Sequence, residues 1–234
     1  MLEYIKQRIS HPRPTDACVV LQSTPVVSFG DASKAHVATL GLNPSRREFN
    51  PVARLATVGS SAEAVLEACN AYFSWKPYRE WFDKLSPCIG GLGKSYSYYD
   101  GSACHLDFVQ WATDPTWNGL NGPTKRRLIE KDAPFLKSQL CNNKNIKFLL
   151  VNGNGPWRQL CKWLPLENPQ RIGSIDGHSY HPMQLYSACL FGRLSVLAWS
   201  TNLQSSPGVR RTLWEKELPE RIKAIAPSLC SRWD

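Results

Sequence analysis

Apolar positions gather into short runs that alternate with amphipathic segments along the chain. Four apolar runs predict buried strands, at residues 36–42, 102–112, 146–153 and 194–200. Two shorter β-rich runs precede them, at residues 17–22 and 25–29. Helical periodicity and capping residues predict helices at residues 60–73, 76–85, 123–140, 209–225 and from residue 156 onward. We expect Pro134 to interrupt the third of these helices, because proline removes a backbone donor.

Strands that alternate with helices are typical of an α/β fold. We therefore predict a three-layer α/β/α architecture with a mainly parallel, four-stranded central sheet. A chain of 234 residues with 42% hydrophobic content is long enough for one well-cored domain, so residues 1–234 are expected to form a single domain. Ligands of such sheets bind beyond the carboxyl ends of the strands. This brings together four strand exits: "GLNPS", "DFVQWATDPTW", "NGNGPW" and "STNLQSSPG".

The charge balance favours a polyanionic partner. Lys and Arg number 28 against 19 Asp and Glu, which gives a net charge of +9. No apolar run approaches the roughly 20 residues that a membrane span needs, and the N-terminus "MLEYIKQRIS" lacks a signal-peptide core. We expect no membrane partner and a cytoplasmic location.

Candidate metal, nucleotide and thiol motifs are incomplete. The eight cysteines are scattered without a CxxC pair, and His178 and His181 have no further ligand nearby at metal-binding spacing. The segment "CIGGLGKS" lacks the first glycine of a phosphate-binding loop and a preceding strand. Cys104 and His105 are adjacent on a strand and point to opposite faces, so they cannot act together. No metal or other cofactor is predicted.

The most informative sequence motifs lie at two strand exits, Gly41-Leu-Asn-Pro-Ser45 and Ser200-Thr-Asn-Leu-Gln204. In these, and in the order of elements from residue 36 to about 211, the chain resembles the uracil-DNA glycosylase superfamily. "GLNPS" is similar to the Gly-x-Asn-Pro first motif of its mismatch-specific and single-strand-selective branches. The second motif, at the exit after residue 199, differs from the pattern of this superfamily: Trp199 stands where those families carry His or Asn, and Ser200 and Thr201 replace Pro-Ser. Leu203 matches their hydrophobic wedge.

The resemblance implies roles for Asn43 and Asp107. Asn43 would orient a hydrolytic water through its side-chain carbonyl, although an Asn before proline is also a common turn former. Asp107 occupies the region where uracil-specific relatives often place an Asn that binds the pyrimidine edge. A carboxylate only accepts hydrogen bonds, which favours the amino group of cytosine. Alternatively, Asp107 pairs with a neighbouring arginine.

The predicted site residues fall into three sets. The catalytic pair is Asn43 and Asp107. The base-binding set is Gly41, Leu42, Phe49, Asp107 and Trp199. The DNA-binding set is Ser45, Arg46, Arg47, Ser200, Thr201, Asn202, Leu203, Gln204, Ser205, Arg210 and Arg211, with Leu203 as an apolar wedge.

The function that this resemblance implies is that of a monofunctional DNA glycosylase, acting as a monomer on single- or double-stranded DNA. It would flip a modified pyrimidine and leave an abasic site. The best candidate is a glucosylated hydroxymethyl cytosine of phage DNA, removed in antiviral defence. Three alternatives stay open: a uracil or mismatch repair glycosylase, a catalytically silent nucleic-acid-binding domain, and a small-molecule α/β hydrolase or nucleotide enzyme.

Overall fold

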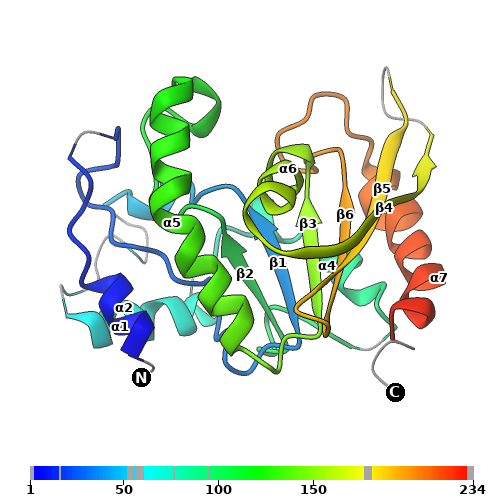
Figure 1. Ribbon diagram of the computed structural model, residues 1–234, viewed down its shortest axis with the longest axis horizontal. Helices are drawn as coiled ribbons and strands as arrows, with labels where there is room; N and C mark the ends of the chain where they lie inside the picture. Colours follow the sequence, from blue (N-terminus) through cyan, green and yellow to red (C-terminus); the bar gives the residue numbers. More distant parts are fainter. Residues whose placement is uncertain are drawn as a thin grey trace.

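The computed structural model describes residues 3–15, 17–51, 55, 59, 61–75, 77–93, 95–176 and 181–230. Ser60, Lys94 and His178, which belong to segments discussed above, lie outside these residues. One six-stranded mixed sheet runs through the molecule in the order β2-β1-β3-β6-β5-β4 (Figure 1). The strands are β1 (Val37–Gly41), β2 (Ala103–Asp107), β3 (Phe148–Asn152), β4 (Leu166–Ile175), β5 (Met183–Leu190) and β6 (Leu194–Trp199).

The four predicted strands correspond to β1, β2, β3 and β6, and these four are parallel to one another. All their residues are buried, which explains why continuous apolar runs reveal them in the sequence.

The prediction of a four-stranded sheet is wrong, because β4 and β5 add an antiparallel pair beside β6. β4 is an exposed edge strand with a polar sequence, two register shifts, Pro169 and Gly173. Proline and glycine are tolerated at an irregular edge, so the sequence of this strand resembles a loop.

Several other predicted elements also differ. Residues 17–22 and 25–29 form no regular strand: they contribute isolated bridges from Val19 to Thr113 and from Phe29 to His105. Of the helix expected at residues 76–85, the described residues form only the short α3 (Arg79–Phe82). Pro87 lies in the first turn of a separate helix, α4 (Ser86–Gly90), instead of ending the predicted one. The helix around Pro134 is continuous, held by the apolar face that it buries.

Helices cover both faces of the sheet. α5 (Gly122–Asn142) and α6 (Asn154–Trp163) share one core cluster with one face, and α2 (Ala62–Asn70), α4 (Ser86–Gly90) and α7 (Leu218–Cys230) share another cluster with the opposite face (Figure 1). The remaining helical segments are α1 (Glu3–Ile9), η1 (Arg46–Phe49), η3 (Tyr72–Ser74), α3 (Arg79–Phe82), η4 (Trp117–Gly119) and the π-helix η5 (Leu213–Glu217). The predicted sandwiching of the sheet between helices is therefore present.

A buried polar network fixes the loop after β2. Arg8 on α1 and Asp132 on α5 form an ion pair at 2.7 Å, with side chains 8% and 1% exposed. Asp132 accepts the backbone N–H of Gln110 at 2.8 Å, and Arg8 donates to the side-chain oxygen of Gln110 at 3.0 Å. The Gln110 amide in turn donates to the carbonyls of Asp107 and Phe108. Two helices thus hold the loop that leaves the sheet at Asp107.

Replacing Asp132 with Asn should reduce the free energy of unfolding by about 3 kcal/mol, because it leaves the buried guanidinium of Arg8 without a counter-charge. Urea unfolding followed by tryptophan fluorescence measures the loss. The control is Glu215→Gln, which breaks the exposed Arg211–Glu215 pair and should cost less than about 1 kcal/mol. Equal losses in the two variants would contradict the importance of the buried pair.

Candidate active site

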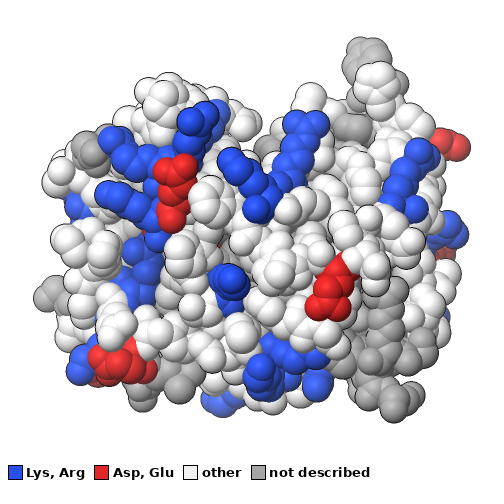
Figure 2. Space-filling model, in the orientation of Figure 1, with Lys and Arg blue, Asp and Glu red and all other residues white. Residues whose placement is uncertain are grey.

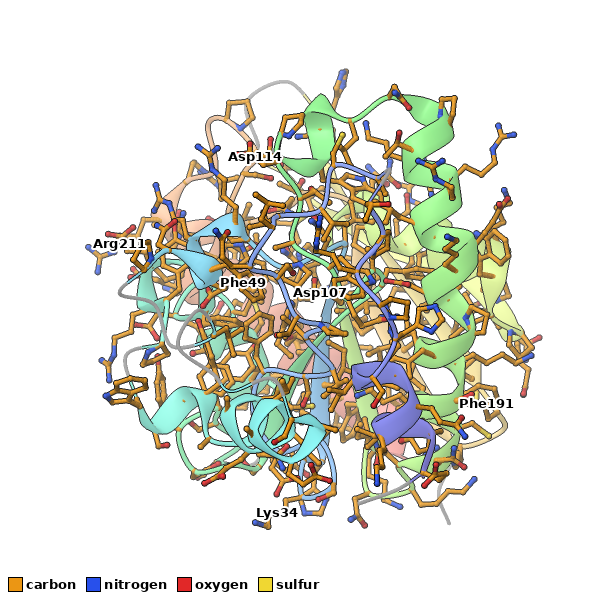
Figure 3. All side chains as sticks on the ribbon, turned by 90° about the vertical axis from the view of Figure 1, so that its left-hand side faces the viewer. Lys34, Phe49, Asp107, Asp114, Phe191 and Arg211 are labelled. Atoms are coloured by element: carbon orange, nitrogen blue, oxygen red, sulfur yellow. The ribbon has the colours of Figure 1, made fainter. Side chains whose placement is uncertain are left out.

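A cavity of about 360 Å³ opens at the carboxyl ends of β1 and β2. Its aromatic lining consists of Phe29, Tyr78, Trp81, Phe82 and Trp117, and its ionisable lining consists of Arg46, Glu48, His105 and Asp107. The rest comes from Gly41, Leu42, Asn43, Pro44, Ser45, Thr113, Thr116, Asn118, Asn202 and Ser205. Figure 3 shows Asp107 well inside the molecule. Three of the four predicted strand exits therefore meet at this cavity.

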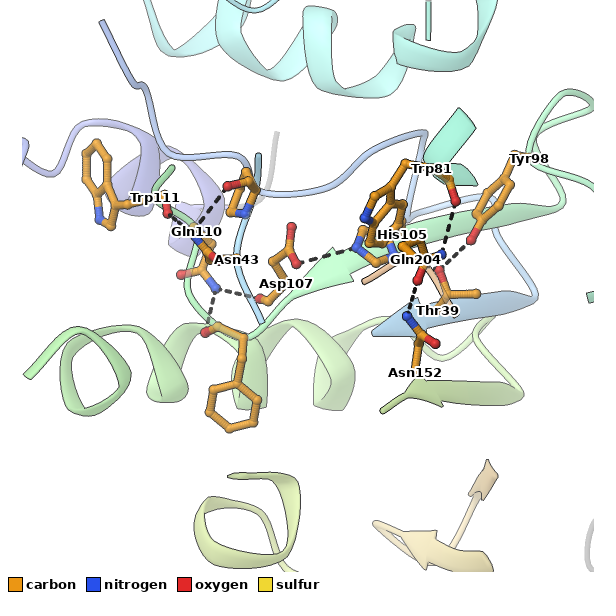
Figure 4. A network of polar contacts seen from close by, with 12 residues as sticks. Thr39, Asn43, Trp81, Tyr98, His105, Asp107, Gln110, Trp111, Asn152 and Gln204 are labelled. Atoms are coloured by element: carbon orange, nitrogen blue, oxygen red, sulfur yellow. Dashed lines mark hydrogen bonds and ion pairs between the residues drawn. The ribbon is translucent and has the colours of Figure 1, made fainter. Parts of the chain in front are cut away.

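The side-chain amide of Asn43 is anchored by its nitrogen. Nδ2 donates to the carbonyl of Trp111 at 3.3 Å (Figure 4). It also donates to the carbonyl of Pro44 and to the hydroxyl of Thr113, each at 3.2 Å. Three oxygens around one amide atom identify that atom as the nitrogen. Within the described residues the opposite atom, Oδ1, has no hydrogen-bond donor. The side chain can therefore accept a hydrogen bond from a ligand or a water.

Gly41 lets two side chains of β2 approach β1 closely. A Cβ atom at this position would lie 2.6 Å from Oδ1 of Asp107 and 3.1 Å from Nε2 of His105. Asp107 and His105 share one face of β2, and Nε2 of His105 lies 3.4 Å from Oδ1 of Asp107. The partner of Asp107 is thus this histidine, and the predicted arginine alternative is wrong within the part of the chain that the structure describes.

A buried hydrogen-bonded chain determines which nitrogen of His105 carries its proton. The Thr39 hydroxyl lies 2.5 Å from the Tyr98 hydroxyl and 2.7 Å from Nδ1 of His105 (Figure 4). Among the described residues, Thr39 is the one hydrogen-bond partner of the Tyr98 hydroxyl, so Tyr98 donates to Thr39 and Thr39 donates to Nδ1. The proton of a neutral His105 then sits on Nε2, directed at Asp107. With this tautomer the N–H of His105 faces the Asp107 carboxyl group, whose Oδ1 lies 3.4 Å away.

Glu48 is a second buried carboxyl group in the cavity wall. Both its oxygens lie 2.9 Å from the Tyr72 hydroxyl, which also accepts the backbone N–H of Tyr78 at 3.0 Å. The pKa of Glu48 rises to about 7, mainly because burial removes the group from water and also because of the charge of Asp107; the Tyr72 hydrogen bond offsets part of the rise. Glu48 can therefore carry a proton near neutral pH.

Several predicted residues line the cavity: Gly41, Leu42, Asn43, Ser45, Arg46, Asp107, Asn202 and Ser205. Arg47 and Gln204 lie instead in an adjoining groove with Tyr78 and Trp81. Ser200 is bound to Gln184 of β5 through its backbone N–H and its hydroxyl.

Four residues that were predicted to contact the base or DNA are buried in the structure. Phe49, Trp199 and Leu203 belong to the hydrophobic core, and Leu203 is 1% exposed. Thr201 is also buried and does not line the cavity. For Trp199 and Leu203 the burial has a local cause. Oδ1 of Asn152 accepts the Trp199 indole N–H at 2.9 Å and the Leu203 backbone N–H at 3.1 Å. These two hydrogen bonds hold the exit that follows β6 against the protein interior. Leu203 is therefore no exposed wedge.

Three arginines of the predicted DNA-binding set form ion pairs with acidic side chains. Arg46 pairs with Asp114, Arg210 with Glu217 and Arg211 with Glu215. Arg211 also lies at the periphery, far from Asp107 (Figure 3). Other cations are spread over the face formed by α5 and α6, with few acidic side chains between them (Figure 2).

The sequence prediction missed Glu48, His105 and the aromatic lining. The spacing of His105 and Asp107, two residues apart on a strand, places both on one face and was an available signal. Glu48 gave no signal, because a glutamate beside two arginines is typical of a solvated segment.

No group of three or more His, Cys, Asp or Glu side chains that could hold a metal ion is found in the described ranges. No helix of those ranges is long and apolar enough to cross a bilayer.

Replacing Gly41 with Ala should displace Asp107 and reduce the free energy of unfolding by about 2 kcal/mol, because the added methyl group has no space. The control is Gly90→Ala, where an added Cβ has no atom within 4 Å and stability should be unchanged or slightly increased. Denaturant unfolding measures both variants, and an equally harmless change at Gly41 would contradict the close approach.

Glu48 should make the protein less stable as the pH rises. Its pKa is about 7 when folded and near 4.5 when unfolded, so the unfolded chain binds fewer protons between these values. The unfolding free energy should fall by about 3 kcal/mol across this window and level off above it. Glu48→Gln should remove this fall, and Glu130→Gln, an exposed change on α5, should keep it. Parallel pH profiles for wild type and Glu48→Gln between pH 5 and 8 would contradict the shift.

Comparison with known proteins adds no family. No protein-family model matches the chain, and no curated protein matches it. The functional argument therefore depends on the geometry of the cavity and on the sequence resemblance.

Proposed function

We propose that the protein is a monofunctional DNA glycosylase that accepts a flipped, modified pyrimidine and hydrolyses its N-glycosidic bond. A glucosylated hydroxymethyl cytosine of phage DNA is the candidate substrate, and antiviral defence is the candidate role. The observation that carries the proposal is the anchored amide of Asn43 at a cavity lined by aromatic and carboxyl side chains.

The proposed reaction needs little acid or base strength from Asn43. As the bond between C1′ and the base nitrogen breaks, its electron pair stays with the base and the sugar becomes oxocarbenium-like. A water held by Asn43 Oδ1 adds to C1′, so that the hydroxyl ends on the sugar and the proton ends on the base. An amide cannot act as a strong base, so its contribution is positioning and electrostatic stabilisation.

The size and lining of the cavity suit a nucleobase. Its volume of about 360 Å³ falls in the usual range for small-ligand sites, about 300–1,000 Å³. Trp81 packs edge-on against His105, with 4.7 Å between ring centroids. A rigid aromatic wall of this kind supports stacking with a flipped base.

The position of Leu203 bears on the form of DNA that is preferred. A paired base must be unstacked at a cost of a few kcal/mol, and a wedge can brace the gap that it leaves. With Leu203 in the core, this help is missing from the second exit. We therefore expect single-stranded DNA to be cleaved faster than duplex DNA.

The test is a panel of oligonucleotides that carry uracil, a thymine mismatch, hydroxymethylcytosine or glucosylated hydroxymethylcytosine, each treated with protein and then alkali. Strand breaks are expected at glucosylated hydroxymethylcytosine. Asn43→Ala should slow breakage by about 100-fold with little change in DNA affinity. The control is Asn142→Ala, an exposed change at the end of α5, which should behave as wild type.

Absence of alkali-labile sites on every oligonucleotide would contradict the proposal, and cleavage of the uracil strand alone would contradict the modified-cytosine substrate. DNA binding that survives in a protein without any turnover would identify the silent binding domain instead.

A further inference from the structure

Two buried carboxyl groups, Glu48 and Asp107, line one cavity. Glu48 and Asp107 are 6% and 5% exposed, and the charge of Asp107 acts on Glu48. Within the described residues no Lys or Arg forms an ion pair with either group. Arg46, which shares the cavity and the helical turn η1 with Glu48, is engaged by Asp114.

Burial and the charge of Asp107 raise the pKa of Glu48 to about 7, so Glu48 can carry a proton near neutral pH. Two buried like charges disfavour simultaneous ionisation. From β2, Nε2 of His105 lies 3.4 Å from Oδ1 of Asp107, whereas the hydrogen bonds that the described residues give to Glu48 come from the Tyr72 hydroxyl of η3. Asp107 is therefore the better acceptor, and Glu48 is the group that can donate.

We propose that Glu48 and Asp107 form a donor–acceptor pair that selects the N3/N4 edge of a cytosine-type base. Protonated Glu48 donates to N3, and the Asp107 carboxylate accepts from the 4-amino group. Uracil-type bases present the opposite pattern, with an acceptor at O4 and a donor at N3. This inference rests on the proposed function, since it assigns the base that enters the same cavity.

A donor at N3 also assists the proposed reaction. Negative charge accumulates on the base as its bond to C1′ breaks, and a hydrogen bond from Glu48 would stabilise that charge. The altered second motif offers no such group, because Trp199 is buried in the core. Glu48 would thus be a specificity residue with a second, leaving-group role.

The test compares two oligonucleotides that differ only at the 4-position of one base, 5-hydroxymethylcytosine or 5-hydroxymethyluracil. A 2′-fluoroarabino sugar at that nucleotide prevents hydrolysis by disfavouring the oxocarbenium-like state. Fluorescence anisotropy gives the affinity for each at pH 6, 7 and 8. Wild type should prefer the cytosine strand by about tenfold or more at pH 6. The preference should fall about tenfold by pH 8, as Glu48 loses its proton.

Substitutions of Glu48 separate protonation from shape. Glu48→Gln carries a donor at every pH, so its preference should not change with pH. Glu48→Leu has no donor, so it should keep only the smaller preference that comes from Asp107, and this preference should not change with pH between about 6 and 8. Glu130→Gln should titrate as wild type. A pH-independent preference in wild type, or a wild-type titration in Glu48→Gln, would overturn the proposal. If Glu48→Leu does not fold, the Gln variant decides alone.

The two proposals can fail separately. Cleavage of glucosylated hydroxymethylcytosine together with a pH-independent base preference would retain the glycosylase and reject the carboxyl pair. A third strand carries a tetrahydrofuran in place of the modified nucleotide and so has no base. If the protein binds this strand and both analogues with equal affinity, the carboxyl pair is rejected. If the protein also cleaves none of the oligonucleotides in the panel, the glycosylase is rejected as well.

Discussion

The amide of Asn43 is held by oxygen atoms that come from a different strand exit, and much of the cavity depends on this contact. Nδ2 donates to Trp111 and Thr113, which follow β2, whereas Asn43 itself follows β1. The loop after β2 is fixed in turn through Gln110 by the Arg8–Asp132 pair. The orientation of the side-chain oxygen of Asn43 is therefore set by a buried network that spans two helices and the sheet. A group held in this way needs no reorganisation when a water or ligand arrives.

A buried chain of hydrogen bonds also orients the polar side chains inside the sheet. The chain from Tyr98 through Thr39 to His105 has one consistent direction, because the buried phenol must donate. That direction ends on Asp107 as an acceptor. Glu48 accepts the Tyr72 hydroxyl, whereas Asp107 lies beside Nε2 of His105. Two chemically similar carboxyl groups thus have different polar neighbours.

The sequence predicts the parallel strands and the exits well, because strands buried on both faces are continuous apolar runs. It does not predict β4, whose polar edge sequence carries Pro169 and Gly173. Asn43 and Asp107 are found because each lies at a strand end. Glu48 is missed because only its tertiary contact with Tyr72, 24 residues away, removes it from water. Burial of this kind depends on packing between distant segments, which no local pattern contains.

In the structure, residues 200–204, which were predicted to contact DNA, make contacts that support the wall of the cavity. Asn152 binds the Trp199 indole and the Leu203 backbone through its oxygen and the Gln204 side chain through its nitrogen. Gln204 then donates to the carbonyl of Trp81 at 3.0 Å (Figure 4). Because Trp81 lines the cavity and packs on His105, this exit supports the aromatic wall from behind. Under the proposed function, selectivity would depend on the aromatic wall and on the polar groups of the cavity, and entry of the base would depend on DNA that is already unstacked.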